Sequence, residues 1–203
     1  MKQDPINFSH EKSSEFIEFR AHLIDKQPIE VVQICLFDSP PYCFADKPFL
    51  FQTFRKEICD KFEIHPQNFT IVGSAKLGFS LNPEKIGQPF TDGSDIDVVL
   101  VSEELFQNLW VQLIEFQRTV LFTLDSNIRQ KFDYLQKVLF FGIIRLDKLS
   151  NDFPFAKEWW EFFNKISTDR RFGPRRVRAA IFKTWKHASF YYEYSIKKIK
   201  EKI

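Results

Sequence analysis

Apolar residues recur along most of the chain at the three- and four-residue spacing of amphipathic helices. Ser13 or Ser14, and further along Ser102, stand where a helix N-cap is expected, and Glu103 provides an acidic first turn after Ser102. The stretch 29–37 is predicted to be short and either helical or extended. The spacing predicts helices at 13–25, 46–62, 102–122, 125–141, 155–166 and 183–202.

Strand-like runs are fewer and shorter than the helical ones. Residues 69–72 and 94–101 have β character, and 98–101 is apolar on both faces, which is typical of a strand inside a sheet. Residues 177–182 are predicted to form either a strand or a first helical turn. The pattern predicts an α+β protein in which several helices wrap a small central sheet.

A chain of 203 residues is long enough to bury a core, and we expect one domain over residues 1–203. Its core is predicted at about 46–125, with helices before it and a basic helical part at 153–203. Phenylalanine is abundant, with 25 residues spread through the predicted helices. We interpret these rings as core-filling side chains rather than as an aromatic binding surface.

The most informative segment joins the two predicted strands at 69–72 and 94–101. The first ends in Gly73-Ser74, and the second carries Asp95 and Asp97 two positions apart. Residues at i and i+2 of a strand point to the same face, so both carboxylates are expected to project together. Adjacent like charges are costly unless a cation neutralises them, and carboxylate oxygens suit Mg²⁺ or Mn²⁺. The alternative is a pair of exposed acids that serves solubility, which the apolar run 98–101 disfavours.

The segment 69–102 resembles the signature of the nucleotidyltransferase superfamily, the group related to DNA polymerase β. The Gly73-Ser74 turn and the run Ser94-Asp95-Ile96-Asp97 carry the resemblance. With the following Gly78 and Ser80, the segment is similar to small bacterial nucleotidyltransferases of defence or toxin–antitoxin loci and to second-messenger synthases. The resemblance implies a small mixed sheet of nucleotidyltransferase type.

The resemblance also implies a chemistry. Asp95 and Asp97 would be the catalytic metal ligands, binding Mg²⁺ or Mn²⁺, while Gly73 and Ser74 would contact the phosphates of a triphosphate such as ATP. The implied activity is metal-dependent transfer of NMP from an NTP to a hydroxyl of a nucleotide, an RNA or a protein. The alternative is a catalytically incomplete, nucleotide-sensing or regulatory partner subunit of the same fold, bound to a partner protein.

Two features depart from that family pattern. The family often has a third carboxylate on a later strand, and here the nearest candidates, Asp147 and Asp152, have no clear strand around them. The third carboxylate is therefore unassigned, which favours the catalytically incomplete alternative. The stretch between the turn and the acids is also long and contains Pro83 and Pro89, so an extra loop is expected there.

Three neighbouring side chains have two interpretations each. Ser74 is either a phosphate contact or the N-cap of a helix, and the two are compatible. Lys76 either contacts a phosphate or is solvated. Ser94 either orients the two carboxylates through a hydrogen bond or belongs to a serine turn.

The charge is distributed unevenly. Residues 170–203 carry 11 Lys and Arg against 2 Asp and Glu, whereas residues 1–169 carry 18 against 25. The basic segment is predicted to meet an anion, which is a triphosphate, an RNA or other nucleic acid, or the acidic body of the protein itself. Aromatic residues of the last helix either stack a base or pack in the core, and packing is favoured for Trp185 and Tyr192. The densest part of the basic segment comprises Arg170, Arg171, Arg175, Arg176 and Arg178.

The remaining sequence features concern the compartment. Cys35, Cys43 and Cys59 are odd in number and lack metal or redox spacing, so we expect reduced thiols and a cytoplasmic protein. No apolar run approaches the ~20 residues of a membrane span, so no membrane partner is expected. The polar start of the chain does not have the pattern of a secretory signal.

Overall fold

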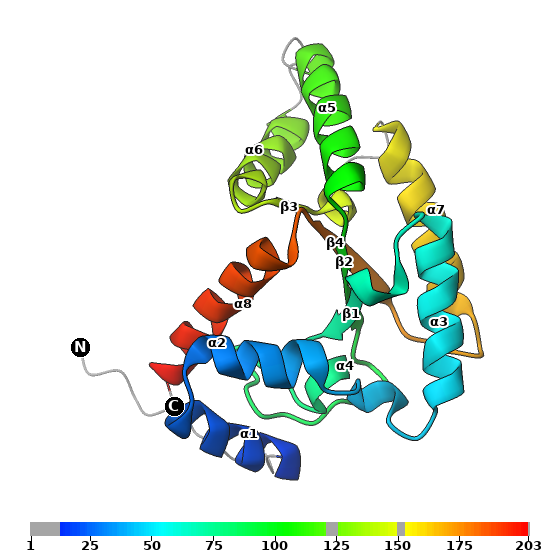
Figure 1. Ribbon diagram of the computed structural model, residues 1–203. Helices are drawn as coiled ribbons and strands as arrows, with labels where there is room; N and C mark the ends of the chain where they lie inside the picture. The colour runs from blue at the N-terminus through cyan, green and yellow to red at the C-terminus, as the bar shows by residue number, and fades with distance from the viewer. Residues whose placement is uncertain (1–12, 121–125, 150–152, 203) are drawn as a thin grey trace.

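A computed structural model describes residues 13–120, 126–149 and 153–202, and within them helices surround a four-stranded mixed sheet (Figure 1). The strands are β1 (Phe69–Val72), β2 (Ile96–Val101), β3 (Ile143–Ile144) and β4 (Val177–Phe182). The longer helices are α1 (Ser14–Asp25), α3 (Pro48–Lys61), α5 (Glu103–Val120), α6 (Ser126–Phe140), α7 (Pro154–Thr168) and α8 (Trp185–Lys200). The shorter ones are α2 (Pro28–Val31), α4 (Ser74–Leu77), the π-helix η1 (Val32–Asp38), and the 3-10 helices η2 (Tyr42–Phe44), η3 (Pro66–Asn68) and η4 (Leu146–Lys148).

The strand order is β1-β2-β4-β3. β2 pairs with β1 in the antiparallel and with β4 in the parallel sense, and β3 adds to β4 in the antiparallel sense. The predicted α+β class is thereby confirmed, and 177–182 is a strand rather than a helical turn. The parallel pair β2–β4 brings together residues 81 positions apart, which only the tertiary fold can do.

The helix predictions are confirmed with small shifts at their ends. Ser13 Oγ accepts a hydrogen bond from the Phe16 amide, and Ser102 Oγ accepts one from the Leu105 amide, so both serines cap as expected. Asp125, the other predicted cap residue, lies outside the described residues. The stretch predicted as short helical or extended is helical, as α2 followed by η1.

One face of the sheet is entirely apolar. Its side chains, including Val98, Leu100 and Ile181, belong to the largest buried cluster, which α3, α5 and α7 complete. Phe54 of α3 and Trp159 of α7 are fully buried there. Most phenylalanines of this cluster contact other rings, which confirms the core-filling interpretation for them.

The opposite face is different, because it is apolar only in part. Val99, Ala180 and Phe182 form a smaller buried cluster against α8. The residues that precede Val99 and Ala180 on the same face are Asp97 and Arg178. In Figure 1, α8 and α6 lie on this side of the sheet, whereas α3 and α7 lie on the other.

A third cluster joins the start of the chain to its last helix. Phe16 and Phe19 of α1 pack with Phe79 and with Ile196 and Ile199 of α8. The three cysteines are free: Cys59 is buried, the other two are half-buried, and burial raises the pKa of Cys59 to about 11. Among the described helices, none has the length and apolarity needed to cross a membrane.

Candidate functional site

The site begins where β1 ends. Gly73 follows β1 with φ of 68° and ψ of −151°, a conformation that L side chains rarely adopt. A Cβ at this position would lie 3.2 Å from Oδ2 of Asp97, which faces the end of β1 across the sheet. Glycine is therefore required both by the turn and by the close approach of the Asp97 carboxylate.

The two predicted acids share one face, as their spacing indicates, but their surroundings differ. Asp95 precedes β2 and its side chain is 33% exposed. Asp97 lies within β2 and is partly buried. Burial raises the pKa of the Asp97 carboxyl, and the positive charges of Arg145 and Arg178 partly offset that effect.

The neighbour of Asp97 on the next strand is an arginine. Arg178 of β4 is in parallel register with Asp97, so both side chains lie on the same face of the sheet. Its Nη2 is 2.8 Å from Oδ2 of Asp95. The Nε of Arg178 is buried, and among the described residues it has no hydrogen-bond partner. A buried donor without a protein acceptor is uncommon and calls for an explanation.

A second arginine approaches the same acids from β3. Arg145 directly follows β3, and its Nε and Nη2 each donate a hydrogen bond of 2.7 Å to Asp147. Asp147, one of the two candidates for a third carboxylate, lies in η4 and is engaged by this paired contact. The other candidate, Asp152, lies outside the described residues.

In the described arrangement, the carboxylates of Asp95, Asp97 and Asp147 do not fit a two-metal centre. One oxygen of Asp95 is already paired with Arg178, and Asp147 is paired with Arg145. Within the described ranges, no three His, Cys, Asp or Glu side chains gather around a point where they would hold a metal ion. The positive charge beside the two predicted ligands is supplied by arginine side chains.

These charges line a cavity of about 520 Å³, within the range of small-molecule sites. Asp97, Arg145 and Arg178 form its wall at the sheet, and Lys198 of α8 and Lys202 just after that helix add further positive charge. Apolar and aromatic residues form much of the rest: Leu36, Leu81, Ile86, Tyr134, Val138, Ile143, Phe182, Tyr191 and Tyr192. The arrangement is suited to an anion attached to a less polar group.

The structure decides the alternative interpretations of Ser74 and Lys76 but does not test their predicted phosphate contacts. The N-cap of α4 is Gly73, so Ser74 is the first helical residue and the N-cap interpretation of Ser74 is wrong. Lys76 is only 4% exposed, so the solvated interpretation is also wrong. Its ammonium group donates to the backbone carbonyls of Phe37 and Ser39 at the end of η1, and burial lowers its pKa to about 8.

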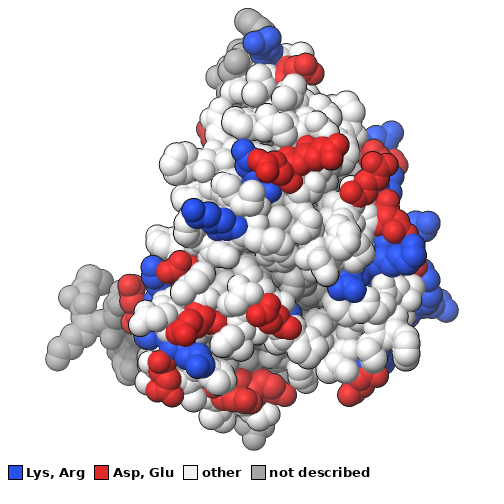
Figure 2. All heavy atoms as spheres, in the orientation of Figure 1, with Lys and Arg blue, Asp and Glu red and all other residues white. Residues whose placement is uncertain are grey.

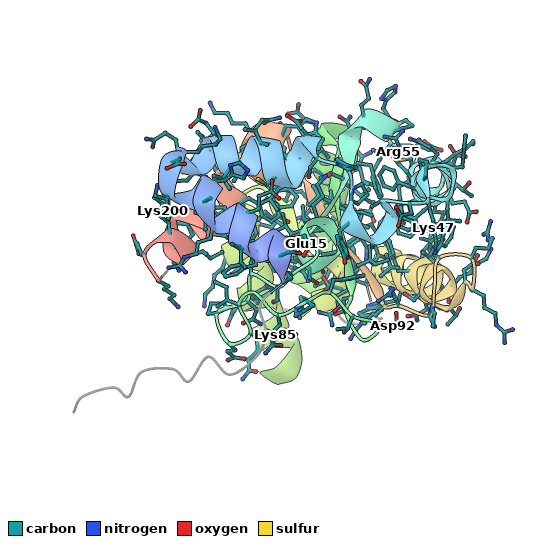
Figure 3. The ribbon with its side chains drawn as sticks, turned by 90° about the horizontal axis from the view of Figure 1, so that it is seen from below. Glu15, Lys47, Arg55, Lys85, Asp92 and Lys200 are labelled. Carbon is teal, nitrogen blue, oxygen red and sulfur yellow. The ribbon has the colours of Figure 1, made fainter. Side chains whose placement is uncertain are left out.

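Ser94 belongs to a turn, which is one of its two predicted interpretations. The Ser94 Oγ accepts a hydrogen bond of 3.0 Å from the Thr91 amide, and the Ser94 amide donates to the Thr91 carbonyl. Its hydroxyl is thus engaged by the turn before β2. The expected extra loop is confirmed: Phe79 and Pro89 pair as an isolated bridge within it. Figure 3 shows Lys85 and Asp92 at different places along this loop, with Lys85 on the side of α1 and Asp92 farther from it.

The basic segment is divided by the fold into separate roles. Arg171 pairs with Asp169 and with Glu57 of α3, and Arg175 pairs with Asp92 and covers the ring of Phe90. Figure 2 shows Lys and Arg side chains beside acidic ones along the edge formed by α3 and α7. Arg171 and Arg175 therefore balance acidic groups of the protein itself, whereas Arg178 lines the cavity.

Sequence reasoning missed several cavity residues. Arg145 is assigned no role from the sequence, although a charged residue between Ile144 and Leu146 is a signal of a special position. Tyr134 carried no signal beyond its place on a predicted helix. Tyr191 is one of the aromatic residues of the last helix for which base stacking and core packing are the two predicted alternatives, and the sequence does not single it out.

Comparison with protein-family models found no matching family, and comparisons with curated proteins and with solved structures found no similar chain. The nucleotidyltransferase resemblance of 69–102 therefore stays a prediction from the sequence.

Proposed function

We propose that this protein binds a nucleoside triphosphate in the cavity without transferring its nucleotidyl group, as a nucleotide-sensing or regulatory subunit. One observation carries the proposal. Arg178 lies on β4, beside Asp97 of β2 and on the same face of the sheet, and its guanidinium is paired with Asp95. In the family that the sequence resembles, a later strand often brings a third carboxylate toward the metal-binding pair. An arginine in that place favours binding an anion over holding a metal ion.

The charge around the cavity supports an anionic ligand. Arg178 retains a buried Nε–H without a described partner, and a phosphate oxygen would accept from it. Arg145 supplies a second fixed positive charge, oriented by its paired contact with Asp147. Arginine binds phosphate through charge-assisted hydrogen bonds, so binding through these groups needs no divalent cation. The Gly73-Ser74 turn supports a nucleotide through the sequence resemblance alone.

The proposal is tested by titration calorimetry in EDTA with the four nucleoside triphosphates and with tripolyphosphate. Arg178→Gln should weaken binding about 10- to 150-fold, because a charge-assisted hydrogen bond contributes ~1.5–3 kcal/mol. Arg175→Gln is the matched control: this arginine is paired with Asp92 and does not line the cavity, so its loss should leave affinity unchanged. Absence of binding by the wild type, or equal effects of the two substitutions, would contradict the proposal.

The metal-dependent enzyme is the competing prediction from the sequence. One observation favours it: Asp95 and Asp97 lie on one face beside the Gly73 turn. Pyrophosphate release is measured with each NTP in the presence of Mg²⁺ or Mn²⁺, with RNA and total cell lysate as acceptors. The proposal predicts no release above that of the Asp97→Asn variant. Release that requires the metal and both acids would establish the enzyme instead.

A further inference from the structure

The cavity is lined by groups of two kinds. Arg145 and Arg178 line it at the sheet, where Asp97 also lies. Tyr134 of α6 and Tyr191 of α8 line the same cavity from two helices that lie on the same side of the sheet, with β3 between them in Figure 1. The cationic and the aromatic walls thus belong to one continuous space.

We infer that Tyr134 and Tyr191 form an aromatic clamp that holds the base of the ligand, while Arg145 and Arg178 hold its phosphates. This inference rests on the proposed function and assigns an orientation to its ligand. Stacking on tyrosine tolerates any base, because every base offers a π-face. The site therefore selects a flat ring joined to phosphates and discriminates weakly among the four bases.

The two tyrosines have the exposure that a clamp requires. Each is 40% exposed, so part of each ring is left uncovered by the protein. Tyr191 is held in place by ring contacts with Phe182 and Tyr192, at centroid distances of 5.8 and 5.1 Å. An anchored ring with an open side loses little conformational freedom when it stacks on a ligand.

The charges of Arg145 and of the two tyrosines affect one another. Burial raises the pKa of Tyr191, Arg145 opposes that shift, and Tyr134 adds to it. Tyr134 in turn contributes to the raised pKa of Arg145, whose main cause is the hydrogen bond to Asp147. Tyr134, Tyr191 and Arg145, which all line the cavity, are therefore close enough to influence one another's charge.

The other aromatic residues of α8 have different roles. Tyr192 and Trp185 pack against Phe37 in the smaller cluster, which confirms the core interpretation made for both from the sequence. Phe190 is 58% exposed and does not line the cavity. Phe190 therefore serves as a control for the loss of an exposed ring from the same helix.

The test compares two ligands in the full chain, ATP and tripolyphosphate, by titration calorimetry in EDTA. Tyr134→Leu and Tyr191→Leu keep apolar bulk and remove the stacking surface. Each should weaken ATP binding roughly 5- to 150-fold, the range expected for one base–aromatic stack, and change tripolyphosphate binding less than about twofold. Phe190→Leu should change neither affinity, and Tyr191→Phe should retain ATP affinity because the ring remains.

The outcomes separate this inference from the proposed function. If the wild type binds neither ATP nor tripolyphosphate, the proposed function fails and the clamp with it. If tripolyphosphate binds but the leucine variants keep wild-type ATP affinity, only the clamp is overturned. Equal loss of both ligands would also overturn it, since the tyrosines would then act on the phosphate end. Should Tyr191→Leu fail to fold, Tyr134→Leu decides. A clamp needs both rings, so wild-type ATP affinity in Tyr134→Leu would overturn it.

Discussion

The two faces of the sheet are built from the same strands and differ in what they carry. One face is closed by α3, α5 and α7 over a wholly apolar cluster with Phe54 and Trp159 at its centre. The other places Asp97 and Arg178 next to a small apolar cluster and leaves a cavity between the sheet and α8. The first face holds the fold together, and the second places charges where a ligand can reach them.

The apolar face offsets the free-energy cost of burying a charged group on the other face. Asp97 is kept in low-dielectric surroundings with its pKa raised by burial, which is unfavourable for folding when the carboxylate is charged. The opposite face compensates, because a continuous apolar cluster contributes most of the hydrophobic free energy of folding. Substitutions on the two faces should accordingly separate stability from binding.

The largest expected effect is on the apolar face. Phe54→Ala should lower the free energy of unfolding by about 3–5 kcal/mol, because a fully buried ring in contact with three other rings is lost. Urea denaturation measures the change, and ATP affinity below the transition should stay as in the wild type. Phe49→Ala removes a ring of the same helix that is 87% exposed, and should change stability by less than about 0.5 kcal/mol. Similar losses for the two would break the distinction between the faces.

Lys76 provides a pH-dependent test near the site. Its pKa is lowered from 10.5 to about 8 by burial, so between these values the unfolded chain binds more protons than the folded one. Stability due to this residue should therefore be lowest below pH 8 and rise as the pH increases toward 10.5, by on the order of 3 kcal/mol.

The measurement is the difference in unfolding free energy between the wild type and Lys76→Met from pH 7 to 10.5. Other lysines and tyrosines titrate in both proteins, so the difference isolates Lys76. The wild type should gain on the variant as the pH rises. A difference that is flat or falls with pH would show that folding does not lower the pKa of Lys76.

The turn at Gly73 should give a smaller effect on stability. Gly73→Ala forces a side chain into a conformation that costs about 1–3 kcal/mol and pushes its Cβ against the Asp97 carboxylate. Gly93→Ala is the control, because a Cβ there meets only Thr91 Oγ1 at 3.9 Å and should change stability by less than about 0.5 kcal/mol. Thermal unfolding of the two variants compares them. An equal response would mean that the close approach of the turn to Asp97 is unimportant.

Much of the sheet face that carries Asp97 could be predicted from local sequence patterns. The period of two in 94–101 places Asp95 and Asp97 on one face, and the glycine at 73 marks the turn beside them. The loop was predictable from the prolines between turn and acids. These features depend on neighbours in the chain, which is why the sequence alone identifies them.

The remaining features depend on contacts between distant residues. Nothing near Arg178 in the sequence indicates that β4 will lie parallel to β2 and bring it to Asp97. The direction of the Lys76 side chain is likewise set by the carbonyls at the end of η1, which the chain reached about forty residues earlier. Arg145 enters the site through a strand of only two residues, too short to produce a recognisable pattern.

The central claim is that Arg178 serves an anionic ligand and that Asp95 competes with that ligand for it. Asp95→Asn should therefore strengthen binding, because it frees the guanidinium from its 2.8 Å pair and removes a negative charge from the site. Both side chains are about one-third exposed, so the gain should be a few-fold, matching a pair worth ~0.2–1 kcal/mol. A metal centre at Asp95 requires the opposite sign, since loss of a ligand carboxylate weakens metal-dependent binding.

The measurement that decides between them is the affinity of Asp95→Asn for ATP, titrated beside the wild type in EDTA and in Mg²⁺. The account predicts that the variant binds ATP a few-fold more tightly than the wild type does, and equally in both solutions. Weaker binding by the variant, with wild-type binding that depends on Mg²⁺, would contradict it.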